Sequence, residues 1–166
     1  MRGPLYTAAE RARRDRSPWT VVQGLLAPIQ FVVFLVSLCL VIRYLATGVG
    51  QWAATASILV KTALLYTIMI TGALWERAVF GRYLFARPFF WEDVVSLVVI
   101  GLHSAYLIAL SGAVFGARQQ MFIALAGYAA YLINASQFVL KLRAARHDSI
   151  AAARAPGSAL LAGANR

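Results

Sequence analysis

Three carboxyl groups in one short segment are the residues of this sequence best suited to proton chemistry. Glu76 lies near the start of the segment, and Glu92 and Asp93 close it. A carboxyl group keeps its proton near neutral pH only where burial or a second carboxylate disfavours the ionised form. Such a group can act as a general acid, and a neighbouring carboxylate as a general base. We expect Glu76 and Glu92 to form an acid/base pair, with Asp93 as the third candidate. The alternative for Asp93 is a carboxylate that stabilises a helix N-terminus.

The segment that carries these groups, residues 75–93, also suits a flat, mostly apolar ligand with an anionic edge. Seven of its nineteen positions are aromatic, where a loop at a membrane surface is ordinarily polar. Guanidinium groups pair with carboxylates, and aromatic rings stack on flat apolar molecules. The predicted ligand contacts are Arg77, Arg82, Arg87, Tyr83, Phe85, Phe89, Phe90 and Trp91. The alternative is an amphipathic interfacial segment without a ligand.

A second group of polar residues lies inside apolar runs of the sequence. Counted at 1.5 Å per residue from the end of each run nearest residues 75–93, five of them reach one depth: Gln30, Tyr66, Thr67, His103 and Tyr131. Asn134 lies about one turn nearer that end, and Lys61 somewhat over one turn further from it. We expect Gln30, Tyr66, Tyr131 and Asn134 to contact substrate. The alternatives are a hydrogen-bond cluster that holds helices together and, for Lys61, an ammonium group that extends to the membrane surface.

His103 could be a buried core residue, a proton carrier or a metal ligand. The only other histidine is His147, so the ligand count excludes a zinc site and a bis-histidine haem. A single axial bond to a metal held in a macrocycle remains. Glu92 and His103 share one face of a predicted helix, about three turns or ~16 Å apart. A ligand of tetrapyrrole size could touch both, and a small substrate could not.

The elements that must position these residues are membrane-spanning helices. Hydrophobic residues make up 61% of the chain, charged residues only 13%, and the mean hydropathy is +0.69. Four apolar runs each reach the ~20 residues that cross a hydrocarbon core of ~30 Å: Val21–Ala46, Ala53–Trp75, Val94–Phe115 and Met121–Leu142. The sequence therefore predicts an all-α integral membrane protein, a four-helix transmembrane bundle formed by residues 1–147. Residues 148–166, rich in Ala and Gly, are expected to be a disordered tail.

The distribution of Lys and Arg predicts the orientation of the bundle. These residues cluster before the first run, between the second and third, and after the fourth, whereas the other two connections offer only Arg43 and Arg118. The positive-inside rule then places both termini and residues 75–93 in the cytoplasm. The net charge of +10 does not indicate a nucleic-acid partner, because the basic residues flank apolar runs and do not interleave with aromatic residues on a soluble module.

A series of short motifs runs through residues 5–147. They are Arg13–Thr20, Gln23–Gly24, Ala27–Phe31, Trp75–Glu76, Phe80–Gly81, Tyr83–Phe85, Phe90–Asp93, His103, Asn134–Ala135 and Gln137–Arg143. Taken together, they resemble the bacteriochlorophyllide 3-vinyl hydratase family. The resemblance implies a hydro-lyase of bacteriochlorophyll a biosynthesis. It would add water across the C3-vinyl group of chlorophyllide a, or of 3-vinyl bacteriochlorophyllide a, to give a 3-(1-hydroxyethyl) group.

The resemblance also implies partners and a place in the cell. The pigment substrate carries its own magnesium, to which His103 could be an axial ligand, and no cofactor is expected. The arginines would bind the free propionate of the pigment. Further expected partners are membrane lipid and other bacteriochlorophyll-biosynthesis enzymes, in the bacterial inner (intracytoplasmic) membrane. One alternative is a non-catalytic pigment-binding or photosystem-assembly protein. A proton-coupled transporter is disfavoured, because no acidic residue lies in the middle of an apolar run.

Overall fold

The computed structural model describes residues 5–112 and 115–154, with the backbone alone at residues 145 and 147–154. This part of the chain forms helices α1 (Ala8–Arg16), α2 (Pro18–Thr47), α3 (Gln51–Phe80), α4 (Phe90–Ser111) and α5 (Ala117–Arg154). Four of them, α2 to α5, are long and apolar enough to cross a membrane. The prediction of an all-α fold with four helices suited to span a membrane is therefore confirmed.

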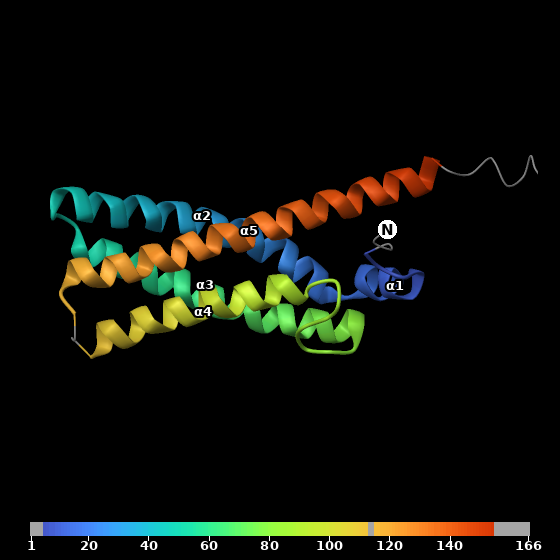
Figure 1. Cartoon of the computed structure of the whole chain (residues 1–166), viewed down its shortest axis with the longest axis horizontal. Coiled ribbons are helices and arrows are strands. Elements are labelled where there is room, and N and C mark those ends of the chain that lie inside the picture. Colours follow the sequence, from blue (N-terminus) through green and yellow to red (C-terminus); the bar gives the residue numbers. More distant parts are fainter. Residues whose placement is uncertain (1–4, 113–114, 155–166) are drawn as a thin grey trace, which may run out of the picture.

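The bundle is built from two helical hairpins. Helix α2 packs along α3, and α4 packs along α5 (Figure 1). Contacts of α2 with α5, and of α3 with α4, join the hairpins into one bundle. The connections 48–50 and 112–116 lie at one end, which we call the distal end. Helix α1 and the connection 81–89 lie at the other, proximal end (Figure 1).

The helices begin and end at residues suited to those positions. Pro18 opens α2, where its missing N–H is not needed for a helical hydrogen bond. Gly48 and Gly81 follow α2 and α3 with φ of 73° and 78°, in the left-handed region that glycine adopts readily. Helices α2 and α3 extend beyond the predicted apolar runs, since their polar end residues are also helical. Helix α4 ends at Ser111, earlier than expected.

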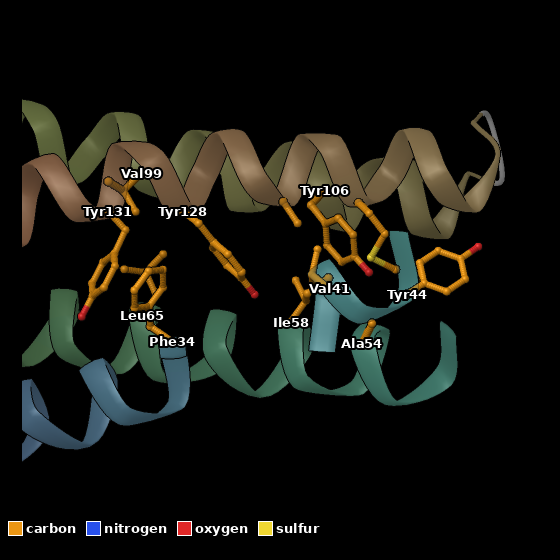
Figure 2. Packing of buried hydrophobic residues seen from close by; sticks show 12 residues of the cluster. Phe34, Val41, Tyr44, Ala54, Ile58, Leu65, Val99, Tyr106, Tyr128 and Tyr131 are labelled. Carbon is orange, nitrogen blue, oxygen red and sulfur yellow. The ribbon is translucent and has the colours of Figure 1, made fainter. Parts of the chain in front are cut away.

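The seam between the hairpins is rich in tyrosine. Tyr106, Tyr128 and Tyr131 point from α4 and α5 toward the α2/α3 hairpin (Figure 2). The Tyr128 hydroxyl lies 2.5 Å from the Ser37 hydroxyl, so a hydrogen bond crosses the seam. The ring centroids of Phe34 and Tyr131 are 4.9 Å apart. The inward faces of the two hairpins thus combine apolar packing with a few polar contacts.

Helix α1 is an element that was not predicted from the sequence. It begins with a capping box in which the Thr7 hydroxyl accepts from the Glu10 N–H and the Glu10 carboxylate accepts from the Thr7 N–H. The Arg13 side chain donates to the Val79 carbonyl over 2.7 Å, which fixes α1 to the proximal end of α3. Helix α1 therefore adds side chains to the surface where residues 75–93 lie.

The C-terminal boundary of the bundle falls inside a helix. Helix α5 continues past residue 147 to Arg154, so the division at residues 147/148 does not coincide with the end of an element. Residues 155–166 of the expected tail lie outside the described residues.

Candidate functional site at the proximal end

Two carboxyl groups meet where α3 ends and α4 begins. Glu76 and Asp93 are each 5% exposed, and their side chains lie within hydrogen-bond reach of one another. The connection between the helices holds both: Asp93 Oδ2 accepts from the Phe85 N–H at 2.7 Å, and Glu76 Oε2 accepts from the Ala86 N–H at 3.1 Å. A hydrogen bond between two carboxyl groups requires a proton on one of them. The arrangement can therefore hold one proton that either group carries.

Glu92 also lies in the first turn of α4, but its side chain faces α5. Its carboxylate lies 2.5 Å from Lys141 Nζ, and the two side chains are 8% and 20% exposed. The Lys141 ammonium also donates to the Pro88 carbonyl and lies 4.7 Å from the centroid of the Phe89 ring. We call Glu76, Glu92 and Asp93 the carboxyl corner. The sequence pairs Glu76 with Glu92, whereas the structure brings Glu76 to Asp93 and Glu92 to Lys141.

The helix N-terminus alternative for Asp93 is supported in part: Asp93 lies in the first turn of α4, where a carboxylate interacts favourably with the helix dipole, but its side chain makes no cap hydrogen bond. Helix α4 has Phe89 at its N-cap and no side-chain cap hydrogen bond. The Asp93 carboxylate instead accepts from Phe85, whose φ of 59° is unusual for a bulky residue. The strained backbone at Phe85 turns its N–H toward the carboxyl corner. Strain of this kind is found where the surrounding structure holds a functional arrangement in place.

The aromatic residues predicted to stack on a ligand divide into two groups. Phe89 is 5% exposed and packs among the rings of Tyr6, Trp75, Phe80 and Phe138, so it supports the bundle from inside. Tyr83, Phe90 and Trp91 are exposed by 51%, 43% and 68%. We call these three the exposed aromatic surface. Phe85 lies beside it, with its ring centroid 5.6 Å from that of Phe90.

The three predicted anchoring arginines also separate. The guanidinium group of Arg77 lies 4.5 Å from the centroid of the Tyr83 ring. Arg82 and Arg87 instead line an open cavity of about 280 Å³, together with Glu10, Phe80, Ala86 and Pro88. Hydrogen bonds from Thr7 hold the pKa of Glu10 below its usual value, so the carboxylate that accepts them stays ionised. The cavity is large enough for a carboxylate group but not for a whole macrocycle.

The predicted polar layer is present, with changes in its membership. Gln30, His103, Tyr131 and Asn134 are all buried, and Lys61 joins them with its Nζ 3.7 Å from the centroid of the Tyr131 ring. We call these five residues the central polar layer. The expectation that the Lys61 ammonium extends to the membrane surface is wrong, because the residue is 0% exposed. Tyr66 bonds instead to Ser104 Oγ at 2.7 Å, and Thr67 is exposed.

His103 lies in the central polar layer, away from the proximal surface. Its Nδ1 is 2.8 Å from the Val99 carbonyl, and the imidazole is 1% exposed. A Cβ added at Gly127 would come within 2.9 Å of His103 Cε1, so α5 passes close to the ring. Within the part of the chain that the structure describes, no group of three or more His, Cys, Asp or Glu residues is arranged to hold a metal ion.

Reasoning from sequence missed three residues at the proximal end. Lys141 neutralises Glu92, Glu10 lines the arginine cavity, and Tyr6 is buried against Phe80 with ring centroids 5.9 Å apart. Lys141 did carry a signal, because a lone lysine at the end of an apolar run must reach either the membrane surface or a buried carboxylate. Glu10 also carried a signal, because Thr7-Ala-Ala-Glu10 fits the capping-box pattern of a helix start. Tyr6 had none, since the docking of α1 is set by tertiary contacts.

Comparison with known proteins gives one consistent result. A model of the 2-vinyl bacteriochlorophyllide hydratase family matches residues 6–144. A curated 2-vinyl bacteriochlorophyllide hydratase of Cereibacter sphaeroides is 65% identical over 149 residues, which cover 89% of this chain and 92% of the relative. The protein of the same name from Rhodobacter capsulatus is 64% identical over 148 residues, or 87% of this chain and 84% of the relative. No solved structure matches the chain. The chain belongs to the 2-vinyl bacteriochlorophyllide hydratase family.

Proposed function

We propose that this protein hydrates the vinyl group of a bacteriochlorophyllide-type pigment, with the carboxyl pair of Glu76 and Asp93 as acid and base. The observation that carries the assignment is the contact between these two buried groups, held by backbone amides beside exposed aromatic rings. The relatives' names number the vinyl position 2, whereas the expectation from sequence numbered it 3. The chemistry of vinyl hydration is the same in either numbering.

The reaction needs one proton to be delivered and one to be removed. The protonated carboxyl of the pair would give its proton to the terminal vinyl carbon, which leaves a cation on the adjoining carbon, stabilised by the conjugated macrocycle. Water then adds to that carbon, and the ionised carboxylate takes the proton that the water loses. Each turnover thus moves the proton from one carboxyl group to its partner, and transfer across their hydrogen bond restores the starting state. No electrons are exchanged, so no redox cofactor is needed.

Substrate binding would use the surface around this pair. The macrocycle would stack on Tyr83, Phe90 and Trp91. A pigment carboxylate would enter the cavity between Arg82 and Arg87. Glu92, engaged in its ion pair with Lys141, would hold α4 and α5 together beside the pair and would not transfer a proton itself. Axial ligation of magnesium by His103 stays a prediction, and it would require the two hairpins to separate around the imidazole.

We further propose that the proximal end faces the cytoplasm, in the bacterial inner membrane. The charges support this orientation: the proximal end carries the basic residues of α1, of the 81–89 connection and of the end of α5, whereas the distal end offers only Arg43 of α2 and Arg118 of α5. Lipid contacts would cover the apolar outer faces, and enzymes that supply or take the pigment would meet the proximal end. A reporter fused after Arg146 should report a cytoplasmic location, and a periplasmic signal would contradict the proposal.

The experiment that tests the catalytic role is Glu76→Gln, with Asp93→Asn as its partner and the exposed Asp15→Asn as the matched control. Because Gln cannot transfer a proton at useful pH, we expect hydration to fall about 10²–10⁴-fold while pigment binding persists. Absorption spectra of purified protein incubated with a 3-vinyl chlorophyllide would follow hydration as a shift of the pigment's long-wavelength band, because the vinyl group is conjugated with the macrocycle. Near-normal hydration in both variants would exclude the carboxyl pair. Binding by the wild type without conversion would favour a non-catalytic pigment-binding role.

A further inference from the structure

The central polar layer contains several buried atoms that lack a hydrogen-bond partner among the residues that the structure describes. They are Gln30 Nε2 and Oε1, Lys61 Nζ, His103 Nε2 and Asn134 Oδ1. The four residues are exposed by only 3%, 0%, 1% and 8%. A buried polar group left without a partner costs about 1–3 kcal/mol. Several such groups from all four spanning helices indicate that something polar satisfies them.

These orphan groups converge on one place between the hairpins. The Lys61 ammonium lies over the Tyr131 ring, which packs against Phe34 with centroids 4.9 Å apart (Figure 2). Gln30 lies one turn before Phe34 on α2, and Asn134 lies about one turn after Tyr131 on α5. Because α2 and α5 run in opposite directions, both amides lie on the proximal side of this contact (Figure 1).

The same layer extends toward α4. His103 packs against α5 at Gly127, and its ring centroid lies 5.8 Å from that of Tyr128, about one turn before Tyr131 on the same helix. The Val99 carbonyl can only accept a hydrogen bond, so the neighbouring Nδ1 of His103 carries the ring proton. The orphan Nε2 of the neutral ring is then an acceptor.

The chemistry of the orphan atoms specifies the ligand. The Gln30 amide nitrogen and the Lys61 amine can donate, whereas the Gln30 amide oxygen, His103 Nε2 and Asn134 Oδ1 accept. A ligand that satisfies all of them must both donate and accept, and it must be small, since these residues are buried. Water meets these conditions, and buried water in proteins characteristically bridges such groups with two to four hydrogen bonds.

Polar side chains continue from this layer to the carboxyl corner. Asn134 Nδ2 donates to Ser96 Oγ over 2.8 Å. Ser96 lies one turn from Asp93 on α4, on the buried face of that helix. On α5, Gln137 lies between Asn134 and Lys141, and its buried Oε1 has no hydrogen-bond partner within the described part of the chain. Polar groups at successive turns thus lead from the centre of the bundle to the proximal end.

We propose that the central polar layer binds a cluster of water molecules inside the bundle, and that Asn134, Ser96 and Gln137 connect this cluster to the carboxyl corner. The water consumed in hydration would then reach the substrate from the interior of the protein, while the macrocycle covers the proximal surface. The delivery step rests on the catalytic role proposed for Glu76 and Asp93. The internal water cluster does not.

Radiolytic hydroxyl-radical labelling of the full chain in lipid nanodiscs, read by mass spectrometry, tests the cluster directly. Radicals formed from bound water label the side chains beside it, so His103 and Tyr131 should be labelled at rates comparable to exposed Tyr83. Met121, which is 0% exposed and intrinsically more reactive, is the dry control and should stay protected. Protection of His103 and Tyr131 like that of Met121 would overturn the proposal. Labelling of Met121 as well would mean general solvent entry, which also overturns a localised site.

Two variants distinguish the binding of water in the central polar layer from its delivery to the substrate. Gln30→Leu removes a donor and an acceptor, so labelling of His103 should fall. Gln137→Leu, outside the central polar layer, should lower kcat for hydration while KM for the pigment and the labelling of His103 stay unchanged. An unchanged kcat would exclude delivery through Gln137. If Glu76→Gln leaves hydration intact but His103 is labelled, the proposed catalytic pair fails and the water cluster stands.

Discussion

Replacing Lys141 by Met removes the partner of a buried carboxylate and should destabilise the bundle strongly. The Glu92 side chain is only 8% exposed, and its ion pair with Lys141 spans 2.5 Å. Breaking one partner of a buried pair costs about 3–5 kcal/mol. We expect about 3 kcal/mol, the lower end of that range, because Lys141 is still 20% exposed. At about 2–4 °C per kcal/mol for a chain of this size, the Tm should fall by about 6–12 °C.

A double-mutant cycle isolates the pair itself. Lys141→Met, Glu92→Gln and the double variant would be unfolded thermally in detergent and followed by circular dichroism. Because replacing both partners of a buried pair is often neutral, the double variant should be more stable than either single variant. Arg143→Met, an exposed basic residue two positions along α5, is the control and should leave the Tm unchanged. A Tm of Lys141→Met equal to that of the control, or strictly additive losses in the double variant, would refute this account of the corner.

Two further predictions concern the arginine cavity and the packing of the bundle. Replacing both Arg82 and Arg87 by Gln should raise KM for the pigment about tenfold with little change in kcat, as loss of a charged hydrogen bond implies. Arg77→Gln should raise KM less, because Arg77 lies outside the cavity. Equal increases of KM in steady-state kinetics would contradict the anchoring role. Gly127→Ala should lower stability by about 1–3 kcal/mol in thermal unfolding, because its new methyl group meets an imidazole carbon at 2.9 Å. Gly101→Ala, with nothing within 4 Å, is the control, and an equal loss there would contradict the packing argument.

The spanning helices could be predicted from sequence because lipid imposes one simple requirement, a long apolar run for each crossing. The depth of polar residues along those runs followed from the helical rise alone, and the structure buries Gln30, His103 and Tyr131 as members of one such layer would be. Depth does not tell which way a side chain faces, however. Tyr66 and Thr67 share the depth of the layer, yet Tyr66 pairs with Ser104 and Thr67 is exposed.

The partners within the candidate site could not be predicted in the same way. Whether Glu76 meets Glu92 or Asp93 depends on the rotation of α4 about its axis and on the strained turn at Phe85, neither of which a local pattern encodes. The burial of Lys61 depends on its packing over the Tyr131 ring of the other hairpin, whereas the properties of a single helix favour extension to the surface. Whether an aromatic residue such as Phe89 faces ligand or core is likewise decided by tertiary packing.

The short distal connections make the protein one-sided. Residues 48–50 and 112–116 are all that joins the spanning helices at the distal end, while the proximal end carries α1, the 81–89 connection and the extension of α5 (Figure 1). Under the proposed function, an enzyme that supplies the pigment and one that collects the product would both bind at the proximal end, so the two could not occupy it at the same time.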